Sequence, residues 1–277
     1  MKQFTILDKA RGVFDRRYAK KVTNRRIYRE RLEGKKGLEI GGPSRIFSDK
    51  GNLPLYDVIG RLDGCNYSET TIWNEEMKEG EGQYRYGDGK TGAQFIQEAS
   101  DLNKISTGSY DFLLASHVLE HCANPLKALE EWKRVVKDDG YLLIVLPHKN
   151  GTFDHRRPVT ALQHVIDDYR LGTKEDDMTH MDEILKLHDF NYDKGTTDVE
   201  SLRQRSLKNM ENRSMHHHVF NGLSAATVVD HAGLKIVDAD VKRPYHIVLF
   251  TQKMKEKPDN SRFVSAAYYQ AISPFGI

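Results

Sequence analysis

The chain has 277 residues, of which 38% are hydrophobic and 30% are charged, and its net charge is +2. These values are typical of a globular α/β domain that carries an insertion, and the nearly balanced charge gives no argument for a nucleic-acid partner. No stretch is apolar enough to span a membrane, no apolar leader follows the N-terminus, and two cysteines, Cys65 and Cys122, are too few for a disulfide framework. We therefore expect a cytoplasmic protein, with oligomer formation left open.

Residues 1–34 form a basic extension. Phe14, Tyr18, Val22 and Ile27 recur at roughly helical spacing within it. This pattern predicts an amphipathic helix that packs on the body and leaves its basic face in solvent. A patch for an anionic polymer or a membrane surface is the alternative.

Apolar runs then predict the strands of the core. They lie at 37–40, within 55–64, within 92–102, at 110–116 and 141–149, in the last part of 222–241, and at 246–253. Asn124 as N-cap and Pro125 as first residue begin a helix that is expected to end at Gly140. Alternation of helices with buried strands predicts a Rossmann-like, doubly wound and mostly parallel sheet of seven strands.

Residues 151–214 interrupt this alternation. They are polar and rich in His, Asp and Arg, and the elements expected there are at most amphipathic helices, such as those within 161–172 and 176–189. The core is therefore expected to comprise 35–150 and 215–253, with 254–277 as a tail. We expect the insertion, which follows the fifth strand, to be a lid or substrate-recognition element; an oligomer-forming or decorative insertion is the alternative.

Two glycines, Gly41 and Gly42, follow the first strand, where a doubly wound sheet binds its ligands. The G-x-G-x-x-G spacing that holds a dinucleotide is missing, which disfavours NAD. About twenty residues further on, Asp63 would accept the hydroxyls of a ribose. Glu98 and the backbone N–H of Ala99 would then bond the edge of an adenine.

These segments, together with "SHVLEH" and "NPLKALEEWKRVVKDDGYL", resemble the class I S-adenosylmethionine-dependent methyltransferases. The resemblance covers 35–150 and, more weakly, 215–253. It implies S-adenosylmethionine as cofactor, with Glu39 and the glycines at its methionine end. Pro43 and Ser44 stand where many members have another small residue. The implied cofactor-binding set is Glu39, Gly41, Gly42, Pro43, Ser44, Asp63, Glu98, Ala99, Ser116, His117 and His121.

The segments "TFDHRRPVT", "HVIDDY" and "NRSMHHHVFN" resemble a narrower bacterial subfamily linked with capsule and surface-polysaccharide synthesis, including O-methyl sugar and O-methyl phosphoramidate decoration. This resemblance implies an O-methyltransferase for a small polar acceptor that is anionic, phosphorylated or sugar-containing. A nicotinamide-dependent oxidoreductase and a non-catalytic binding module are the alternatives. A nucleic-acid methyltransferase is disfavoured because "SHVLEH" stands where a D/N-P-P-Y/F segment would be required.

Methyl transfer to a hydroxyl needs alignment of the reactants and removal of a proton, for which a neutral histidine is suited. The predicted catalytic residues are His117, His155 and His217. The predicted acceptor-binding residues are His148, Asp154, His155, Arg156, Arg157, His216 and His218. The arginine pair offers forked donors for a phosphate or carboxylate, with ion pairs to the acids of 176–183 as the alternative.

The run "MHHHVF" also raises the possibility of a metal site. In a strand, His216 and His218 would share a face and could ligate zinc or manganese with His180, His188 or Asp189. No HxxxH or CxxC spacing supports such a site, and methyl transfer from a sulfonium does not require a metal. The sequence therefore predicts no metal.

Overall fold

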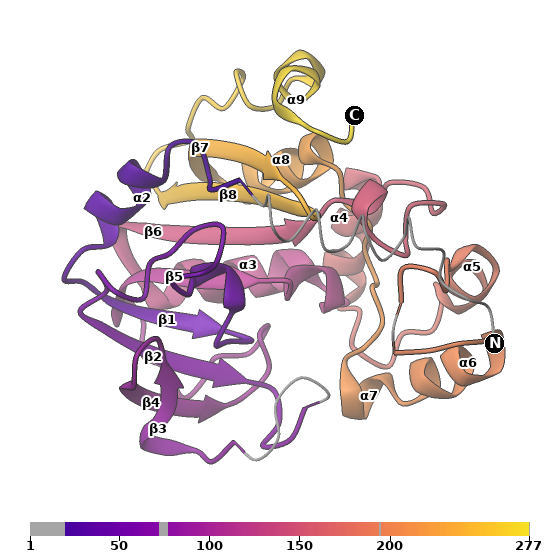
Figure 1. The fold of residues 1–277 in the computed structure, drawn as a ribbon, viewed down its shortest axis with the longest axis horizontal. Helices are drawn as coiled ribbons and strands as arrows, with labels where there is room; N and C mark the ends of the chain where they lie inside the picture. Colours follow the sequence, from indigo (N-terminus) through magenta and orange to yellow (C-terminus); the bar gives the residue numbers. More distant parts are fainter. Residues whose placement is uncertain (1–19, 72–76, 194, 277) are drawn as a thin grey trace.

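A computed structural model of the chain describes residues 20–71, 77–193 and 195–276. Its centre is a mixed sheet of eight strands in the order β3-β4-β2-β1-β5-β6-β8-β7 (Figure 1). The strands are β1 Lys36–Ile40, β2 Arg61–Asn66, β3 Gly80–Tyr86, β4 Lys90–Ile96, β5 Tyr110–Ser116, β6 Val136–Pro147, β7 Leu234–Lys242 and β8 His246–Lys253.

Helices and short 3₁₀ turns connect and cover these strands. They are α2 Arg25–Leu32, η1 Arg45–Phe47, η2 Leu119–His121, α3 Pro125–Val135, η3 Lys149–Gly151, α4 Leu162–Leu171, α5 Met181–Leu187, α6 Val199–Leu207, α7 Asn209–Asn212, α8 Gly222–His231 and α9 Ala266–Ile272. No helix among the described residues has both the length and the apolar character needed to cross a membrane.

The strand order reverses between β1 and β5. From β1 the chain proceeds to β2 and β4 on one side, and from β5 to β6 on the other, with all four of these neighbouring pairs parallel. In such a sheet, ligands bind beyond the carboxyl ends of the strands at the point of reversal. The Rossmann-like α/β class is therefore present, and the fold places the candidate site after β1 and β5.

The number of strands differs from the expected seven. Strand β3 pairs antiparallel with β4 at the edge of the sheet, and of its residues only Tyr84 and Tyr86 are buried. Its polar sequence gives no continuous apolar run, so the pattern used for the core strands missed it. Strands β7 and β8 are also antiparallel to their neighbours, which makes the sheet mixed.

Two element boundaries were also wrong. The apolar residues Leu55, Tyr56 and Ile59 lie in a buried connection, and the second strand begins only at Arg61. Helix α3 ends at Val135 because the chain enters β6 at Val136, five residues before the expected terminator Gly140. The C-terminal segment, for which no element was expected, contains α9.

Both faces of the sheet are covered. Successive residues of β5 alternate between two apolar clusters: Leu113 packs with Leu129 and Trp132 of α3, whereas Phe112 packs with Tyr28 of α2. Burial on both faces accounts for the continuous apolar character of this strand.

The N-terminal extension is described only from residue 20 onward, so Phe14 and Tyr18 lie outside the described residues. Helix α2 buries Tyr28 and Leu32, while the side chain of Ile27 is 38% exposed. The predicted apolar face is therefore wrong at Ile27, because α2 begins at Arg25 and turns Tyr28 inward instead.

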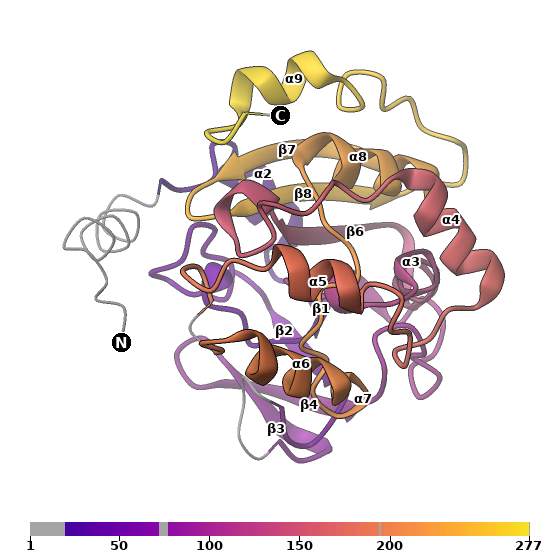
Figure 2. The same ribbon diagram turned by 90° about the vertical axis from the view of Figure 1, so that its right-hand side faces the viewer.

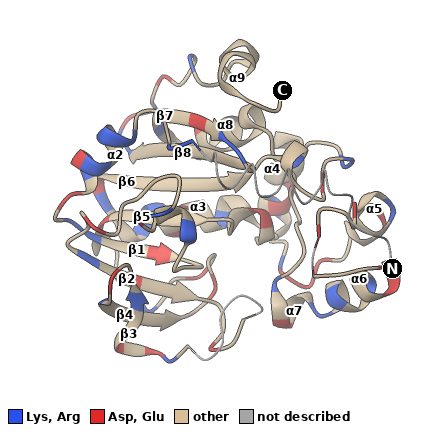
Figure 3. Ribbon diagram, in the orientation of Figure 1, with Lys and Arg blue, Asp and Glu red and all other residues tan. Residues whose placement is uncertain are grey.

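Lysines and arginines of this region are interspersed with acidic residues (Figure 3). On α2, Arg26 pairs with Glu30, and Arg29 pairs with Asp57 at 2.6 Å. These exposed pairs fit the expected solvated basic face.

Residues 148–221 lie between β6 and α8 and contain α4 to α7. Figure 2 shows α5 and α6 in front of the strand ends, on the side to which the arrows of β1, β2 and β6 point in Figure 1. Ile184, Leu202 and Met215 form a small apolar cluster of their own within this segment. The segment thus covers the edge of the sheet where the site is expected.

Candidate active site

A cavity of about 790 Å³ lies at the carboxyl ends of the parallel strands. Ile40 ends β1, Asn66 ends β2 and Ser116 ends β5, and all three line it. Its size is within the range of about 300–1,000 Å³ that is typical of small-molecule sites. The position is the one that the strand reversal predicts.

The glycine turn after β1 forms one wall. Gly41 lines the cavity with a φ of +73°, and a Cβ added there would lie 2.6 Å from the side chain of Val118. At Gly42 an added Cβ would lie 2.3 Å from the hydroxyl of Tyr84. Gly41 therefore requires glycine for its conformation and for space, and its backbone can approach a ligand closely. Gly42 requires glycine for space beside Tyr84 and Glu39, but it does not line the cavity, in contrast to its predicted place beside the cofactor. Pro43 and Ser44 continue this wall.

Glu39 lies beneath the turn and does not line the cavity. Its carboxylate accepts hydrogen bonds from the hydroxyls of Tyr84 at 2.6 Å and Tyr56 at 2.9 Å, and from the backbone N–H of Ser44 at 3.0 Å. Burial raises the pKa of Glu39, while hydrogen bonds from Ser44, Tyr84 and Tyr56 oppose that shift. The residue therefore holds the shape of the turn from below.

Asp63 is not in the position expected for a ribose ligand. It lies in the middle of β2, buried, and accepts hydrogen bonds from Arg61 at 3.0 Å and from Tyr110 at 3.0 Å. The expected location was wrong because β2 continues for three residues beyond Asp63. Asn66 is the polar residue at the strand end, and its side chain donates to the carbonyl of Gly42 at 3.2 Å.

Glu98 and Ala99 line the cavity after β4, as their sequence position predicts. Glu98 forms an ion pair with Arg213, which arrives from the segment after α7 and stacks on the ring of Tyr67. Two buried polar atoms of the wall, the Tyr67 hydroxyl and Gln97 Nε2, have no hydrogen-bond partner among the described residues. A ligand with polar groups, such as a nucleoside, would satisfy them.

His117 and His121 line the cavity next to Ser116. His117 has a φ of +57°, uncommon for a residue with a side chain, and its Nε2 lies 2.9 Å from Nδ1 of His246. Its Nδ1 lies 3.4 Å from the carboxylate of Glu120. Burial lowers the pKa of His246 well below the usual range, which favours its neutral form.

The predicted acceptor-binding residues of the insertion do not line the cavity. Arg157 is 1% exposed and binds Asp154 and Glu183, so the ion-pair alternative applies to it. Arg156 and His155 both contact Asp189, at 2.8 and 2.9 Å. These charges neutralise one another within the insertion.

The histidines of "MHHHVF" diverge because the segment is not a strand. His216 binds Asp154 at 2.5 Å, His217 approaches the Asn209 side chain at 3.1 Å, and His218 binds Asp168 at 3.0 Å. The expected shared face of His216 and His218 is therefore wrong. His148 is buried, stacks on Phe275 with centroids 4.8 Å apart, and does not line the cavity.

Several cavity residues were not found from the sequence. Three basic and four aromatic side chains line the cavity although the sequence predicted no role for them: Arg45, Lys50, Arg213, Tyr67, Tyr192, Tyr245 and His246. Arg45 and Tyr67 had an available signal, because Arg45 directly follows the turn of Gly41 to Ser44 and Tyr67 directly follows β2.

Glu175 of the insertion also lines the cavity, and burial raises its pKa to about 7. Because the folded state then binds the proton more tightly than the unfolded state, this group makes the protein less stable as the pH rises from about 4.5 through 7. Relative to the wild type, Glu175→Gln is expected to gain up to about 3 kcal/mol of unfolding free energy over that interval. Urea denaturation of both proteins at a series of pH values measures it; a difference that does not change with pH would contradict the assignment.

The chain is similar over residues 52–144 to the methyltransferase domain family. Together with the α/β fold and the cavity at its strand reversal, this match over about a third of the chain indicates a methyltransferase that uses S-adenosylmethionine as its cofactor. No curated protein is significantly similar to the chain in sequence.

The chain is also similar, at low sequence identity, to several solved structures. An S-adenosylmethionine-dependent methyltransferase from Methanosarcina mazei is 19% identical, with 83% of this chain and 98% of that chain covered and a TM-score of 0.46. A putative S-adenosylmethionine-dependent methyltransferase from Listeria monocytogenes is 13% identical, with 84% and 96% covered and a TM-score of 0.46. A Thermotoga maritima protein, described as a possible histamine N-methyltransferase, is 16% identical, with 90% and 96% covered and a TM-score of 0.43.

Proposed function

We propose that the protein transfers the methyl group of S-adenosylmethionine to a hydroxyl oxygen of a small polar acceptor that carries an anionic group or a sugar. The supporting observation is the composition of the cavity: His117 lies at the end of β5, and three cationic side chains, Arg45, Lys50 and Arg213, line the same space. Arg213 is paired with Glu98, which leaves Arg45 and Lys50 as the better candidates for an acceptor anion.

The residues that form the cavity wall fit S-adenosylmethionine. The glycine turn gives a close backbone approach, and the Tyr67 hydroxyl and Gln97 Nε2 are buried polar atoms that need partners. We assign the amino-acid end of the cofactor to the turn of Gly41 to Ser44, its ribose to Asn66 in place of Asp63, and its adenine to Glu98 and Ala99. The cofactor supplies an activated methyl group on a sulfonium; the protein aligns the acceptor and removes its proton.

His117 is the proposed base, with Glu120 orienting its ring. The insertion over the strand ends would exclude water and complete the acceptor site, which strengthens polar contacts to the acceptor. A cytoplasmic location, expected from the composition of the sequence, and a role in capsule or surface-polysaccharide synthesis, implied by the sequence resemblance, belong to the same proposal.

Isotopically labelled S-adenosylmethionine, incubated with the protein and a bacterial extract, tests the function. We expect one new labelled metabolite, detected by mass spectrometry, whose label resists conditions that cleave methyl esters, as a methyl ether does. A label on nitrogen or on a macromolecule would contradict the proposal. The same extract incubated with the His117→Asn variant is the control.

Calorimetry with S-adenosylhomocysteine tests the cofactor assignment. Asn66→Ala is expected to weaken binding about tenfold, the order of one lost hydrogen bond. Asp63→Asn serves as the comparison, because Asp63 lies outside the cavity and its substitution is expected to affect stability rather than affinity. Equal loss of affinity in the two variants would contradict the assignment, and binding of NAD alone would favour the oxidoreductase alternative.

A further inference from the structure

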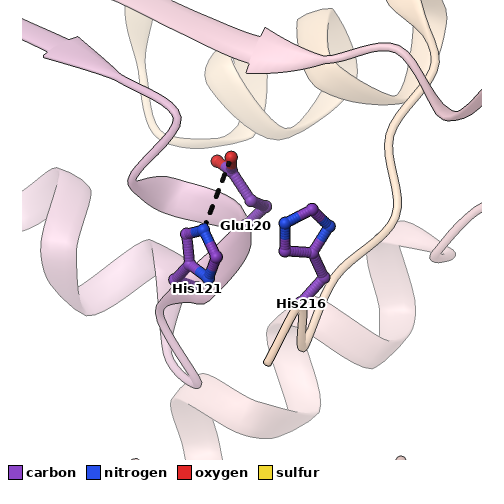
Figure 4. Close-up of side chains that lie close together, drawn as sticks. All are labelled: Glu120, His121 and His216. Carbon is purple, nitrogen blue, oxygen red and sulfur yellow. Dashed lines mark ion pairs between the residues drawn. The ribbon is translucent and has the colours of Figure 1, made fainter. Parts of the chain in front are cut away.

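A cluster of three potential metal ligands lies beside the cavity. Glu120 and His121 come from η2, directly after β5, and His216 comes from the segment between α7 and α8. Each offers one ligand atom, and the three atoms all lie within 4.8 Å of one another. Figure 4 shows the three side chains converging from these two parts of the chain.

The carboxylate of Glu120 is only partly satisfied by the protein. The residue is 1% exposed, and its Oε1 lies 3.4 Å from Nδ1 of His117 and 3.9 Å from Nε2 of His121. Its Oε2 is buried and has no hydrogen-bond donor among the described residues. Buried carboxylate oxygens rarely lack a partner, and a cation in the cluster would provide one.

Both histidines are oriented as metal ligands usually are. Nδ1 of His121 forms a hydrogen bond to the carbonyl of Met215 at 2.9 Å, and Nε2 is the nitrogen that lies near Glu120. Nδ1 of His216 forms a hydrogen bond to the carboxylate of Asp154 at 2.5 Å, so Nε2 is the atom that would coordinate a metal ion. A carbonyl or carboxylate on the second ring nitrogen is the usual support of a metal-bound imidazole.

Another residue fixes the position of the carboxylate that contacts His216. Asp154 is itself fixed by Arg157, whose side chain lies 2.9 Å away and is almost fully buried. The buried Asp154–Arg157 pair, for which the cavity offers no direct role, is thus explained as the group that positions His216.

We propose that Glu120, His121 and His216 form a binding site for a divalent transition-metal ion such as Zn²⁺ or Mn²⁺. Two imidazoles and one carboxylate favour such ions over Mg²⁺ or Ca²⁺, which prefer oxygen ligands throughout. Three protein ligands also leave coordination positions open, as in catalytic rather than structural sites. His121 lines the cavity, so an open position is accessible from it.

The role of the ion rests on the proposed function, whereas the site itself does not. A hydroxyl of the acceptor that binds the ion becomes more acidic. Its proton passes to His117, the oxygen forms the bond to the methyl carbon, and the carbon–sulfur bond breaks with its electron pair remaining on sulfur. The site departs from the sequence-based expectation, which assigned no metal and considered His216 together with His218.

A second cluster provides a matched comparison. His164, Asp168 and His218 also bring their ligand atoms within 4.8 Å of one another. Here, however, Asp168 accepts from Thr173 at 3.0 Å through one oxygen and contacts His218 at 3.0 Å through the other. Because both carboxylate oxygens already have partners, this cluster carries no metal proposal.

The test is metal binding by the full chain without any acceptor. Protein freed of metal with a chelator is titrated with ZnCl₂ or MnCl₂ in a calorimeter, and the bound metal is measured by mass spectrometry after dialysis. We expect about one ion per chain. Glu120→Gln is expected to weaken binding at least about 100-fold, and Asp154→Asn about 10- to 100-fold, as for loss of a supporting group. His164→Gln, in the second cluster, is expected to bind as the wild type does.

Circular dichroism and S-adenosylhomocysteine binding show whether the variants are folded. Glu120→Gln is the preferred variant because it keeps the shape of a side chain whose Oε2 makes no hydrogen bond. Absence of metal binding in the wild type, unchanged binding in Glu120→Gln, or equal loss in His164→Gln would each overturn the proposal. Binding of S-adenosylhomocysteine by the metal-free protein is measured separately, so failure of the metal site and failure of the proposed function are distinguishable.

Discussion

Replacing His117 with asparagine is expected to lower kcat for methyl transfer by roughly 10²- to 10⁴-fold, the usual contribution of a general base. The φ of +57° at this position directs the choice of variant. Asparagine adopts the left-handed region more readily than other residues with side chains, so it keeps the backbone while it removes the proton acceptor. Affinity for S-adenosylhomocysteine is expected to stay close to that of the wild type.

The measurement uses the acceptor found with the labelled methyl donor. His231→Asn is the matched control, because His231 is exposed at the end of α8, away from the cavity. A kcat for His117→Asn within a few-fold of the wild type would mean that His117 does not remove the proton. Equal losses of kcat and of S-adenosylhomocysteine affinity would instead assign His117 to cofactor binding.

Much of the fold was predictable because burial on both faces leaves a continuous apolar run. This pattern located β5 at its actual bounds of Tyr110–Ser116, and β1 to within one residue. The same pattern misled at 55–59, since Leu55, Tyr56 and Ile59 are buried in a connection that packs under the sheet. A buried loop and a buried strand have the same composition, and only strand pairing distinguishes them.

The candidate site was predictable wherever residues directly follow a strand of the parallel sheet. Gly41, Pro43, Ser44, Glu98, Ala99, Ser116, His117 and His121 all line the cavity. Their position is fixed by topology, because parallel strands end at the same edge. The prediction for Asp63 was wrong because the sequence pattern ended the second strand at this residue. The strand β2 continues to Asn66, so Asp63 does not lie at the strand end.

The insertion could not be predicted in this way. Its charged residues were expected to face an acceptor, yet Arg157 is buried between Asp154 and Glu183. The segment of His216 to His218 has no regular structure, so no period sets the direction of its side chains. Long-range packing determines which acidic side chain pairs with which basic side chain in the insertion. The proximity of His216 to Glu120 is therefore visible only in the three-dimensional structure.

The second large effect is expected at the buried carboxylate below the glycine turn. Glu39→Ala should lower the free energy of unfolding by about 3–5 kcal/mol, because it leaves the hydroxyl of Tyr84 without its acceptor, leaves that of Tyr56 with only the carbonyl of Ser44, and creates a void in the core. The backbone N–H of Ser44 loses one of its two acceptors and keeps the hydroxyl of Tyr56. Urea denaturation at neutral pH measures the change.

Glu39→Gln separates the hydrogen bonds from the volume. Its amide keeps one acceptor oxygen in the same space, so a loss of only about 1–2 kcal/mol is expected, as for one mismatched buried hydrogen bond. Both variants should also weaken binding of S-adenosylhomocysteine, the alanine variant more, since the turn that follows Glu39 forms the cavity wall. If Glu39→Ala proves as stable as Glu39→Gln, the carboxylate does not hold the turn, and the affinity of the site must depend on the glycines alone.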